Sequence, residues 1–430
     1  MRARVILTTA MMAAMAVGLT AQHGATNLAD ILPMEHPAIE YSSSDPTDAV
    51  ARLQARIDAG ETELAYDRRF GYLPAVLDAL GIPLSSQALV FSKTSFQAVR
   101  IFPRGPRAIY HAPEVSVGWV RGGDVVEIAS LDPKLGVVFY TLDQRESSHP
   151  RFRLRVTECI SCHVGPATMG VPGLMVRSVY ADRNGRPMRG PSYLTDHRSP
   201  LSERWGGWYL SGLSGSQTHL GNLVVEGSRI PREIDFRETN NLEKLRGFFD
   251  AAAYLQPTSD IVSLMVLEHE TGMVNRLVRL GYESRILLDA AGSYAALPEQ
   301  ALEKIERAAD ELVRYTLFAE EALLEEPVKG TDAYQQAFEA GGVRDDDGRS
   351  LRDLDLETRL LRYPCSYLVY SEAFDALPEP VLALVYEGMW DALNGDGFGR
   401  LSADDRKAII EILRATKSGL PDYWMERAAD

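Results

Sequence analysis

Five consecutive residues, Cys159-Ile160-Ser161-Cys162-His163, restrict the fold of this chain more than any other stretch. Two thiols three positions apart, followed at once by an imidazole, have the spacing that attachment of a c-type haem requires. The thiols can bond the two vinyl groups on one edge of a porphyrin, and the next residue then lies beneath the iron as an axial ligand. The motif therefore predicts one covalent haem c, held by Cys159 and Cys162 and ligated by His163.

Three other interpretations of the motif can be weighed from the sequence. A structural zinc site needs four ligands, and Cys365 is the only other cysteine in the chain. A thioredoxin-like redox pair begins a helix that follows a strand, whereas Gly165 and Pro166 should end any helix here within one turn. A plain disulfide between Cys159 and Cys162 remains as an alternative. Cys365 lies in an apolar stretch and is expected to be a buried free thiol.

Residues 1–21 have the pattern of a secretory signal peptide. Arg2 and Arg4 precede an apolar run from Val5 to Leu19, and Thr20-Ala21 is a plausible cleavage end. Export agrees with the motif, because c-type haem is attached outside the cytoplasm. A periplasmic location is therefore expected. No later segment reaches about eighteen uninterrupted apolar residues, so we expect no membrane span in the mature chain.

The charge of the chain limits its partners. With 60 acidic residues against 45 lysines and arginines, the formal net charge is −15. Such a chain is not expected to bind nucleic acid or an anionic membrane through electrostatic attraction. A redox partner protein with a basic surface would suit it better.

The pattern of apolar residues predicts an α+β fold in five consecutive segments. Residues 1–21 are the signal peptide, and 22–86 form a helical lead in which Asp45 caps the first helix. A β-rich unit over 87–157 delivers the chain to Cys159, with a hairpin at Gly122-Gly123. Residues 158–235 have little periodicity and read as an irregular segment that binds haem c. Residues 236–430 form a mostly α-helical domain.

Runs of β-type or helical residues give the expected elements. The expected strands are 88–91, 108–110, 115–120, 125–128, 137–140 and 152–156. The expected helices are 72–80, 261–282, 302–313, 354–374 with an interruption at Pro364, 380–393, and 402–416.

The sixth ligand of the iron is left open by the sequence. His219 lies 56 residues after His163, which is enough chain to circle the porphyrin and return over the iron. His197 is the next candidate, and we expect His219 in preference to it. Three methionines are weaker candidates, because Met169 and Met175 follow the motif too closely and Met188 lies in a polar turn. His111, His149 and His269 are less constrained candidates, and an open sixth position is also compatible with the sequence.

Several phrases resemble known proteins. Gly165-Pro166 resembles the loop of small cytochromes c, in which a proline carbonyl accepts the second imidazole proton. The phrases at 204–209, 259–262 and 362–367 resemble a family of long exported bacterial monohaem proteins, which the chain would match over most of its mature length. The resemblance implies haem c and no particular reaction.

Two functions from different classes remain. The first is electron transfer by an exported monohaem cytochrome. The second is a haem-dependent oxidoreductase of the peroxidase type with an open distal site, in which His197, Arg198, Arg204 or His219 would polarise a bound peroxide.

Overall fold

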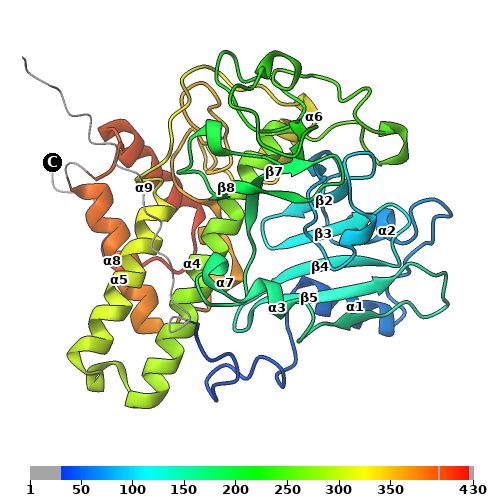
Figure 1. Ribbon diagram of the computed structural model, residues 1–430. Helices are drawn as coiled ribbons and strands as arrows, with labels where there is room; N and C mark the ends of the chain where they lie inside the picture. Colours follow the sequence, from blue (N-terminus) through cyan, green and yellow to red (C-terminus); the bar gives the residue numbers. More distant parts are fainter. Residues whose placement is uncertain (1–30, 396–397, 426–430) are drawn as a thin grey trace, which may run out of the picture.

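The computed structural model describes residues 31–395 and 398–425, which have the α+β fold that the sequence predicts (Figure 1). The strands are β1 (Ala88–Val90), β2 (Arg107–Ala112), β3 (Val115–Val120), β4 (Val125–Asp132), β5 (Gly136–Asp143), β6 (Phe152–Leu154), β7 (Val176–Asp182), β8 (Pro187–Thr195), β9 (Trp208–Tyr209) and β10 (Val224–Val225). The helices are α1 (Ala49–Asp58), α2 (Leu73–Ala79), α3 (Ile160–His163), α4 (Ile261–Ala291), α5 (Glu299–Thr316), α6 (Asp332–Ala340), α7 (Glu372–Asp375), α8 (Glu379–Asn394) and α9 (Ala403–Thr416). The predicted signal peptide lies outside the described residues.

Seven strands form one antiparallel sheet in the order β6-β5-β4-β3-β2-β1-β9. The strands β1 to β6 lie where their β-branched and aromatic residues predict them. The turn between β3 and β4 places Gly122 at φ +67°, a conformation that glycine adopts without steric cost. The edge strand β9 comes from the segment 158–235, so this segment contributes to the sheet rather than standing apart from it.

One face of the sheet is buried beneath α1 and α2. The Trp119 ring in β3 contacts Phe70, and the Tyr140 hydroxyl in β5 donates a hydrogen bond to Asp48. Asp48 also caps α1, since its Oδ1 accepts a hydrogen bond from the backbone N–H of Val50 (2.8 Å). The prediction of Asp45 as the cap is wrong by three residues. Asp48 is the cap, and it accepts hydrogen bonds both from the sheet, through Tyr140, and from the first turn of the helix, through Val50.

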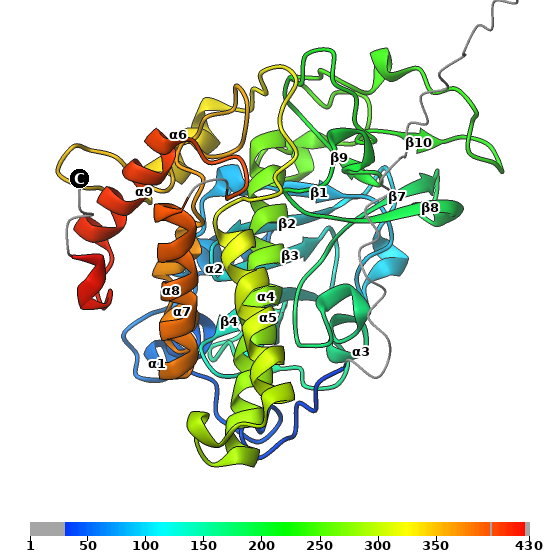
Figure 2. The same cartoon turned by 90° about the vertical axis from the view of Figure 1, so that its left-hand side faces the viewer.

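The other face of the sheet carries the long helix α4. Asp260 caps it by accepting from the N–H groups of Val262 and Ser263, and Gly292 ends it with φ +76°. The helix runs past Ile261–Tyr282, the range that the apolar pattern predicts, to Ala291. The middle of α4 is buried on all sides. The sheet covers one flank, α5 packs against the other, and α8 packs against α5 (Figure 2).

Residues 176–195 form a hairpin that the sequence did not predict. β7 pairs with β8 on one side and with β10 on the other, in a small second sheet (Figure 2). β8 contains two prolines and a glycine and is mostly exposed, so neither composition nor alternation marks it as a strand. The prediction that residues 158–235 are irregular is therefore wrong for the strands β7, β8, β9 and β10.

The C-terminal helices follow the prediction in part. α8 and α9 lie at 379–394 and 403–416, close to the predicted bounds, and Ser402 with Asp405 forms a capping box at α9. The predicted helix over 354–374 is wrong, because most of this stretch is irregular and ends in two short turns at 367–370 and 372–375. The helix α6 at 332–340 was missed.

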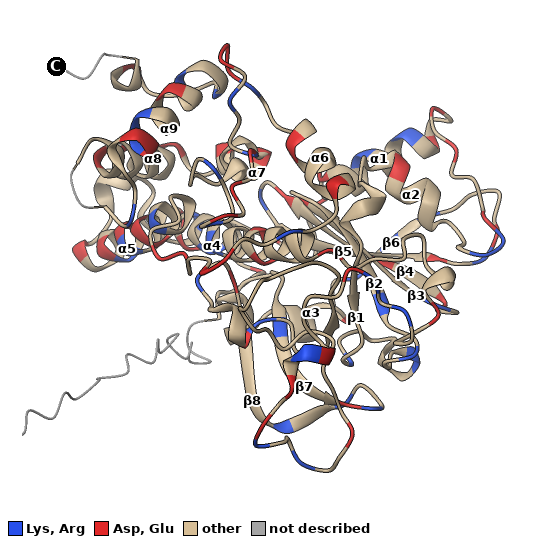
Figure 3. Ribbon diagram, turned by 90° about the horizontal axis from the view of Figure 1, so that it is seen from above, with Lys and Arg blue, Asp and Glu red and all other residues tan. Residues whose placement is uncertain are grey.

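A single cluster of buried side chains extends from Ile39 to Trp424, so the predicted segments share one core. Acidic residues outnumber basic ones along α5, which is coloured red over much of its length in Figure 3. Within 31–395 and 398–425, no helix combines the length and the apolar character that crossing a membrane requires.

Candidate functional site

The Cys159–His163 motif forms a single helical turn after the edge strand β6. Cys159 immediately precedes α3, and the helix stops at His163 because Val164 is extended and Gly165-Pro166 turns the chain away. Both thiols are free, with Cys159 half-buried and Cys162 exposed. The turn therefore presents two unpaired thiols and an imidazole within five residues. Cys365 is free and fully buried, as predicted.

The His163 imidazole has one nitrogen engaged. Its Nδ1 donates to the carbonyl oxygen of Gly173 (2.8 Å), and the Gly173 N–H donates back to the carbonyl of His163 (3.0 Å). The ring packs against Phe139 of β5, with 4.6 Å between the ring centroids. Burial lowers the pKa of His163, so the imidazole is neutral near pH 7. Because Nδ1 carries the proton, Nε2 is the nitrogen whose lone pair can bind a metal.

The carbonyl that orients His163 belongs to Gly173 and not to Pro166. The resemblance to small cytochromes c suggested the proline. In this chain the Gly-Pro turn has another use, since the buried Thr168 hydroxyl accepts from the Gly165 N–H (3.2 Å) and lies 2.8 Å from the Val171 carbonyl. The turn folds the chain back, and Gly173 thereby reaches His163.

The long helix α4 fixes this return segment. The Asn275 side chain accepts from the Leu174 N–H (2.9 Å) and donates to the Leu174 carbonyl (2.7 Å). A side chain at position 173 would collide with Asn275, so the close approach requires glycine. The orientation of His163 thus depends on a helix more than 100 residues further along the chain.

The state of the Cys159 thiol argues against a thiol–disulfide exchange site. Burial, followed by the nearby carboxylates of Glu127 and Glu158, raises the pKa of Cys159 to about 11. A redox-active cysteine pair requires the opposite shift, because the thiolate is the attacking species. Among the described residues, no group of three or more His, Cys, Asp or Glu side chains is placed to hold a metal ion. His163 is thus not part of such a cluster within the described residues.

The sheet face that carries Phe139 is incompletely covered by protein. Phe139 of β5, Ala129 of β4, Ser116 of β3 and His111 of β2 form one cross-strand row that faces α4. Ser116 and Ala129 are only half-buried, although they lie in the middle of a seven-stranded sheet. In the next row, Ile109 is also half-buried. An apolar group that lay on this face would bury side chains that the protein leaves partly open.

A buried ion pair borders the same face. Arg107 and Glu127 form a salt bridge (2.6 Å) in which both side chains are less than a fifth exposed. The Arg107 guanidinium lies over Gly118, where a Cβ would collide with it. The Nε atom of Arg107 is buried, and no described residue accepts its hydrogen bond. Arg107 thus has one donor to spare for an anionic group close to His163.

His219, the expected sixth ligand, lies elsewhere. Its ring stands edge-on to Trp205 (5.4 Å between centroids), and its Nδ1 accepts from the Gly221 N–H (3.1 Å). Trp205 comes just before β9 at one edge of the sheet, whereas Phe139 lies on β5 near the other edge. Five strand spacings separate β5 from β9, which is about 24 Å at roughly 4.8 Å each. We therefore do not retain His219 as an iron ligand.

His197 is also engaged away from the motif. It is buried beside α4, with its Nδ1 2.8 Å from Nδ1 of His269 and its ring against Tyr315 and Phe318. Burial, followed by the neighbouring His269, holds the pKa of His197 well below its usual value. Its Nε2 is buried without a partner among the described residues.

The remaining predicted residues lie at different depths. Arg198 pairs with Asp196 (2.8 Å), and the buried Arg204 pairs with Glu268. Met169, Met175 and Met188 are all half-buried.

A buried polar network on α4 was not predicted from the sequence. Three consecutive residues each pair with a different part of the chain, namely Glu268 with Arg204 (3.0 Å), His269 with His197 (2.8 Å) and Glu270 with His111 (2.7 Å). Successive residues of a helix point about 100° apart, so three buried titratable neighbours require a helix enclosed on several sides. The signal was present as three titratable residues inside an otherwise apolar helix.

Comparisons with protein-family models, with curated proteins and with solved structures find no match to this chain. The functional assignment consequently rests on the residues themselves.

Proposed function

We propose that this protein is an exported monohaem c-type cytochrome, with one haem held covalently by Cys159 and Cys162 and His163 as axial ligand. The observation that carries the proposal is the pair of free thiols on one turn with a neutral imidazole, whose Nδ1 is bonded to Gly173. Haem would supply one-electron redox chemistry at its iron.

The residues around the motif fit such a group. Gly173 fixes the tautomer and orientation of His163, and Asn275 fixes the next residue, Leu174, so two successive layers of hydrogen bonds hold the imidazole in place. The half-buried face at Ile109 and Ala129 offers apolar surface for a porphyrin. Arg107 would suit a carboxylate of the bound group, because its buried Nε has no acceptor among the described residues.

Electron transfer in the periplasm, with a redox partner protein, is the function we favour. The signal-like residues 1–21 and the motif support export together. The net charge of −15 and the excess of acidic residues along α5 suit a basic partner surface.

A haem-dependent oxidoreductase is the second candidate, and one observation favours it. His219 and His197 are both held in contacts away from His163, which leaves the sixth position without its two expected histidines. An open position would allow a small molecule such as peroxide to bind there.

The proposal is tested by expressing the full chain with a c-type haem maturation system and unfolding the purified protein in detergent. We expect haem to migrate with the polypeptide on a denaturing gel and to give a c-type pyridine haemochrome spectrum. Haem that leaves the unfolded protein in acidic organic solvent would contradict the proposal.

The His219→Ala variant is expected to keep the haem absorption spectrum and the carbon monoxide affinity of the wild type. The reason is the position of His219 beside Trp205, at the other edge of the sheet. Loss of its buried hydrogen bonds should lower the free energy of unfolding by about 1–3 kcal/mol. A shift of the ferric spectrum to high spin in this variant alone, with Asn240→Ala as the matched control, would restore His219 as a ligand.

A further inference from the structure

A second site lies at the far end of the row that begins at Phe139. A cleft of about 440 Å³ opens between the α2–β1 connection, the β2–β3 turn and α6. Its walls are largely apolar, with Leu77, Ile82, Tyr334 and Phe338 among them. The volume falls within the usual range for small-molecule sites.

The floor of the cleft is polar, and the described contacts engage its polar atoms. His111 contacts Glu270 through Nδ1 (2.7 Å) and Ser263 through Nε2 (2.9 Å). The other Glu270 oxygen accepts from the Tyr367 hydroxyl (2.7 Å). Burial alone would raise the pKa of Glu270, but His111, then Tyr367 and the positive charge of Arg352, outweigh it and the pKa is lowered. Both oxygens of the Glu270 carboxylate therefore have hydrogen-bond partners within the protein.

The side chain of Arg352 also lines the cleft, and its N–H groups have no hydrogen-bond acceptor among the described residues. It is half-buried, with its guanidinium carbon 4.9 Å from the Tyr367 ring centroid and 5.5 Å from that of Phe338. The guanidinium lies over Gly341, where a Cβ would collide with it. Among the described residues, no carboxylate lies within 4.0 Å of it, and no acceptor for its side-chain N–H groups is found. The Phe338 and Tyr367 rings and Gly341 thus hold the Arg352 guanidinium in place, although no described residue accepts its N–H donors.

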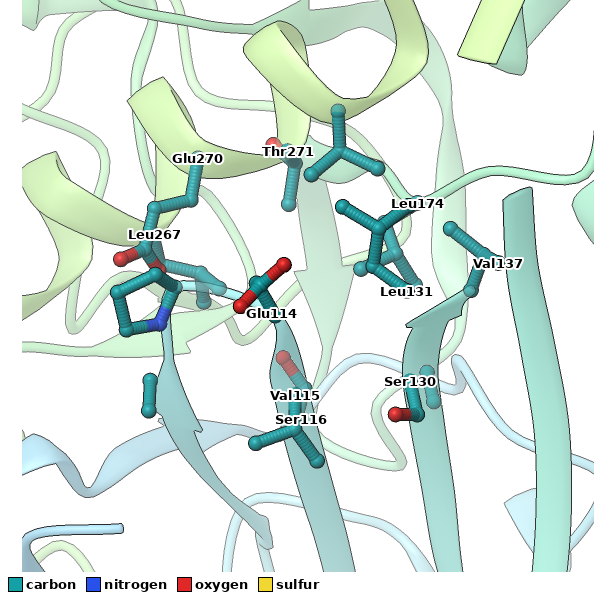
Figure 4. Close-up of a pocket in the computed structure, with 14 residues that line it drawn as sticks. Glu114, Val115, Ser116, Ser130, Leu131, Val137, Leu174, Leu267, Glu270 and Thr271 are labelled. Atoms are coloured by element: carbon teal, nitrogen blue, oxygen red, sulfur yellow. The ribbon is translucent and has the colours of Figure 1, made fainter. Parts of the chain in front are cut away.

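The cleft continues towards the haem side of the sheet. Ala112, Pro113 and Glu270 line both the cleft and a smaller cavity beneath α4, which reaches Leu174 (Figure 4). Leu174 follows Gly173, the residue that orients His163. The cleft therefore shares lining residues with the cavity that reaches Leu174, although α2, from the opposite face of the sheet, also lines it with Leu77 and Asp78.

We propose that this cleft binds a small apolar molecule that bears one carboxylate, with Arg352 as the residue that pairs with the carboxylate. A guanidinium fixed on aromatic rings offers two parallel N–H donors that match a carboxylate in geometry and charge. The apolar walls then cover the body of the ligand. Two carboxylates also line the cleft. Asp78 at the rim is solvent-exposed, so water screens its charge, and the Glu270 oxygens are already engaged by His111 and Tyr367. The proposal goes beyond haem attachment and does not depend on it.

Calorimetric titration of the purified full chain tests the proposal with phenylacetate and its uncharged isostere phenylacetamide. We expect saturable binding of phenylacetate at millimolar concentration and about tenfold weaker binding of phenylacetamide, since only the former forms a charge-assisted pair. Arg352→Gln should remove this preference. Arg362→Gln is the matched control, because Arg362 also stacks on a tyrosine ring but is exposed and outside the cleft.

A cleft-filling change gives an independent check. Ala337→Trp, on α6, should weaken the binding of both probes without changing the charge of the site. Haem content measured on every variant separates this site from the attachment motif. Equal binding of the two probes, unchanged preference in Arg352→Gln, or no binding of either probe by the wild type would overturn the proposal.

Discussion

The Cys159→Ala, Cys162→Ala double variant is expected to yield protein with essentially no covalent haem, under conditions in which the wild type is fully loaded. Both thioether bonds of the proposed haem would form at these free thiols, and the other cysteine, Cys365, is fully buried in the core and cannot replace them. The measurement is haem staining of the denatured protein, normalised to the amount of polypeptide.

Cys365→Ala is the matched control for the double variant. It removes one thiol from the core and should keep wild-type haem content, although it lowers stability through the cavity that it leaves. Covalent haem retained in the double variant, or lost in Cys365→Ala alone, would contradict the assignment of the thiols.

The Arg204→Met variant is expected to lose about 3–5 kcal/mol of unfolding free energy, because it leaves the fully buried Glu268 carboxylate without its countercharge. Burial is the main reason that the pKa of Glu268 is raised to about 7, and Arg204 opposes this shift. The pKa of this carboxyl group is higher in the folded state than its ordinary value of about 4.5, so the folded state binds the proton more tightly and is more stable at low pH than at high pH. That contribution is lost as the pH rises through about 7.

Removing Arg204 should raise the Glu268 pKa further, so the loss of stability should be larger at pH 8 than at pH 5. Urea unfolding at the two pH values measures it, and the Glu268→Gln, Arg204→Met double variant should recover part of the loss at pH 8. Arg314→Met is the control, since Arg314 pairs with Glu320 at the surface and should change stability by less than about 1 kcal/mol. A loss at Arg204 no larger than at Arg314 would contradict the role of the buried pair.

Local signals predicted the parts of the fold that depend on local residues. The strands β1 to β6 and the helices α8 and α9 follow from β-branched runs, caps and apolar spacing, and all lie close to their expected positions. The hairpin of β7 and β8 was missed because β8 is exposed and contains prolines, so its strand character comes from pairing with β7 rather than from its own composition.

The candidate site could be predicted only where the chemistry is contiguous in sequence. Cys159, Cys162 and His163 are one turn, and their spacing alone identifies them as a unit. The partner of His163 could not be identified, because Gly173 is positioned by Asn275 from a helix that reaches it only in the folded state. His219 was expected at the iron from chain length alone, and length does not specify which edge of the sheet a residue reaches.

The most direct test of the account is the mass of the peptide that contains residues 159–163, isolated by proteolysis of the unfolded, haem-loaded protein. We expect this peptide to carry the added mass of one haem and to absorb as a haem chromophore, while the peptide with Cys365 is unmodified. A peptide of unmodified mass, or one with a disulfide between Cys159 and Cys162, from protein matured in the presence of haem would contradict covalent attachment and, with it, the proposed function.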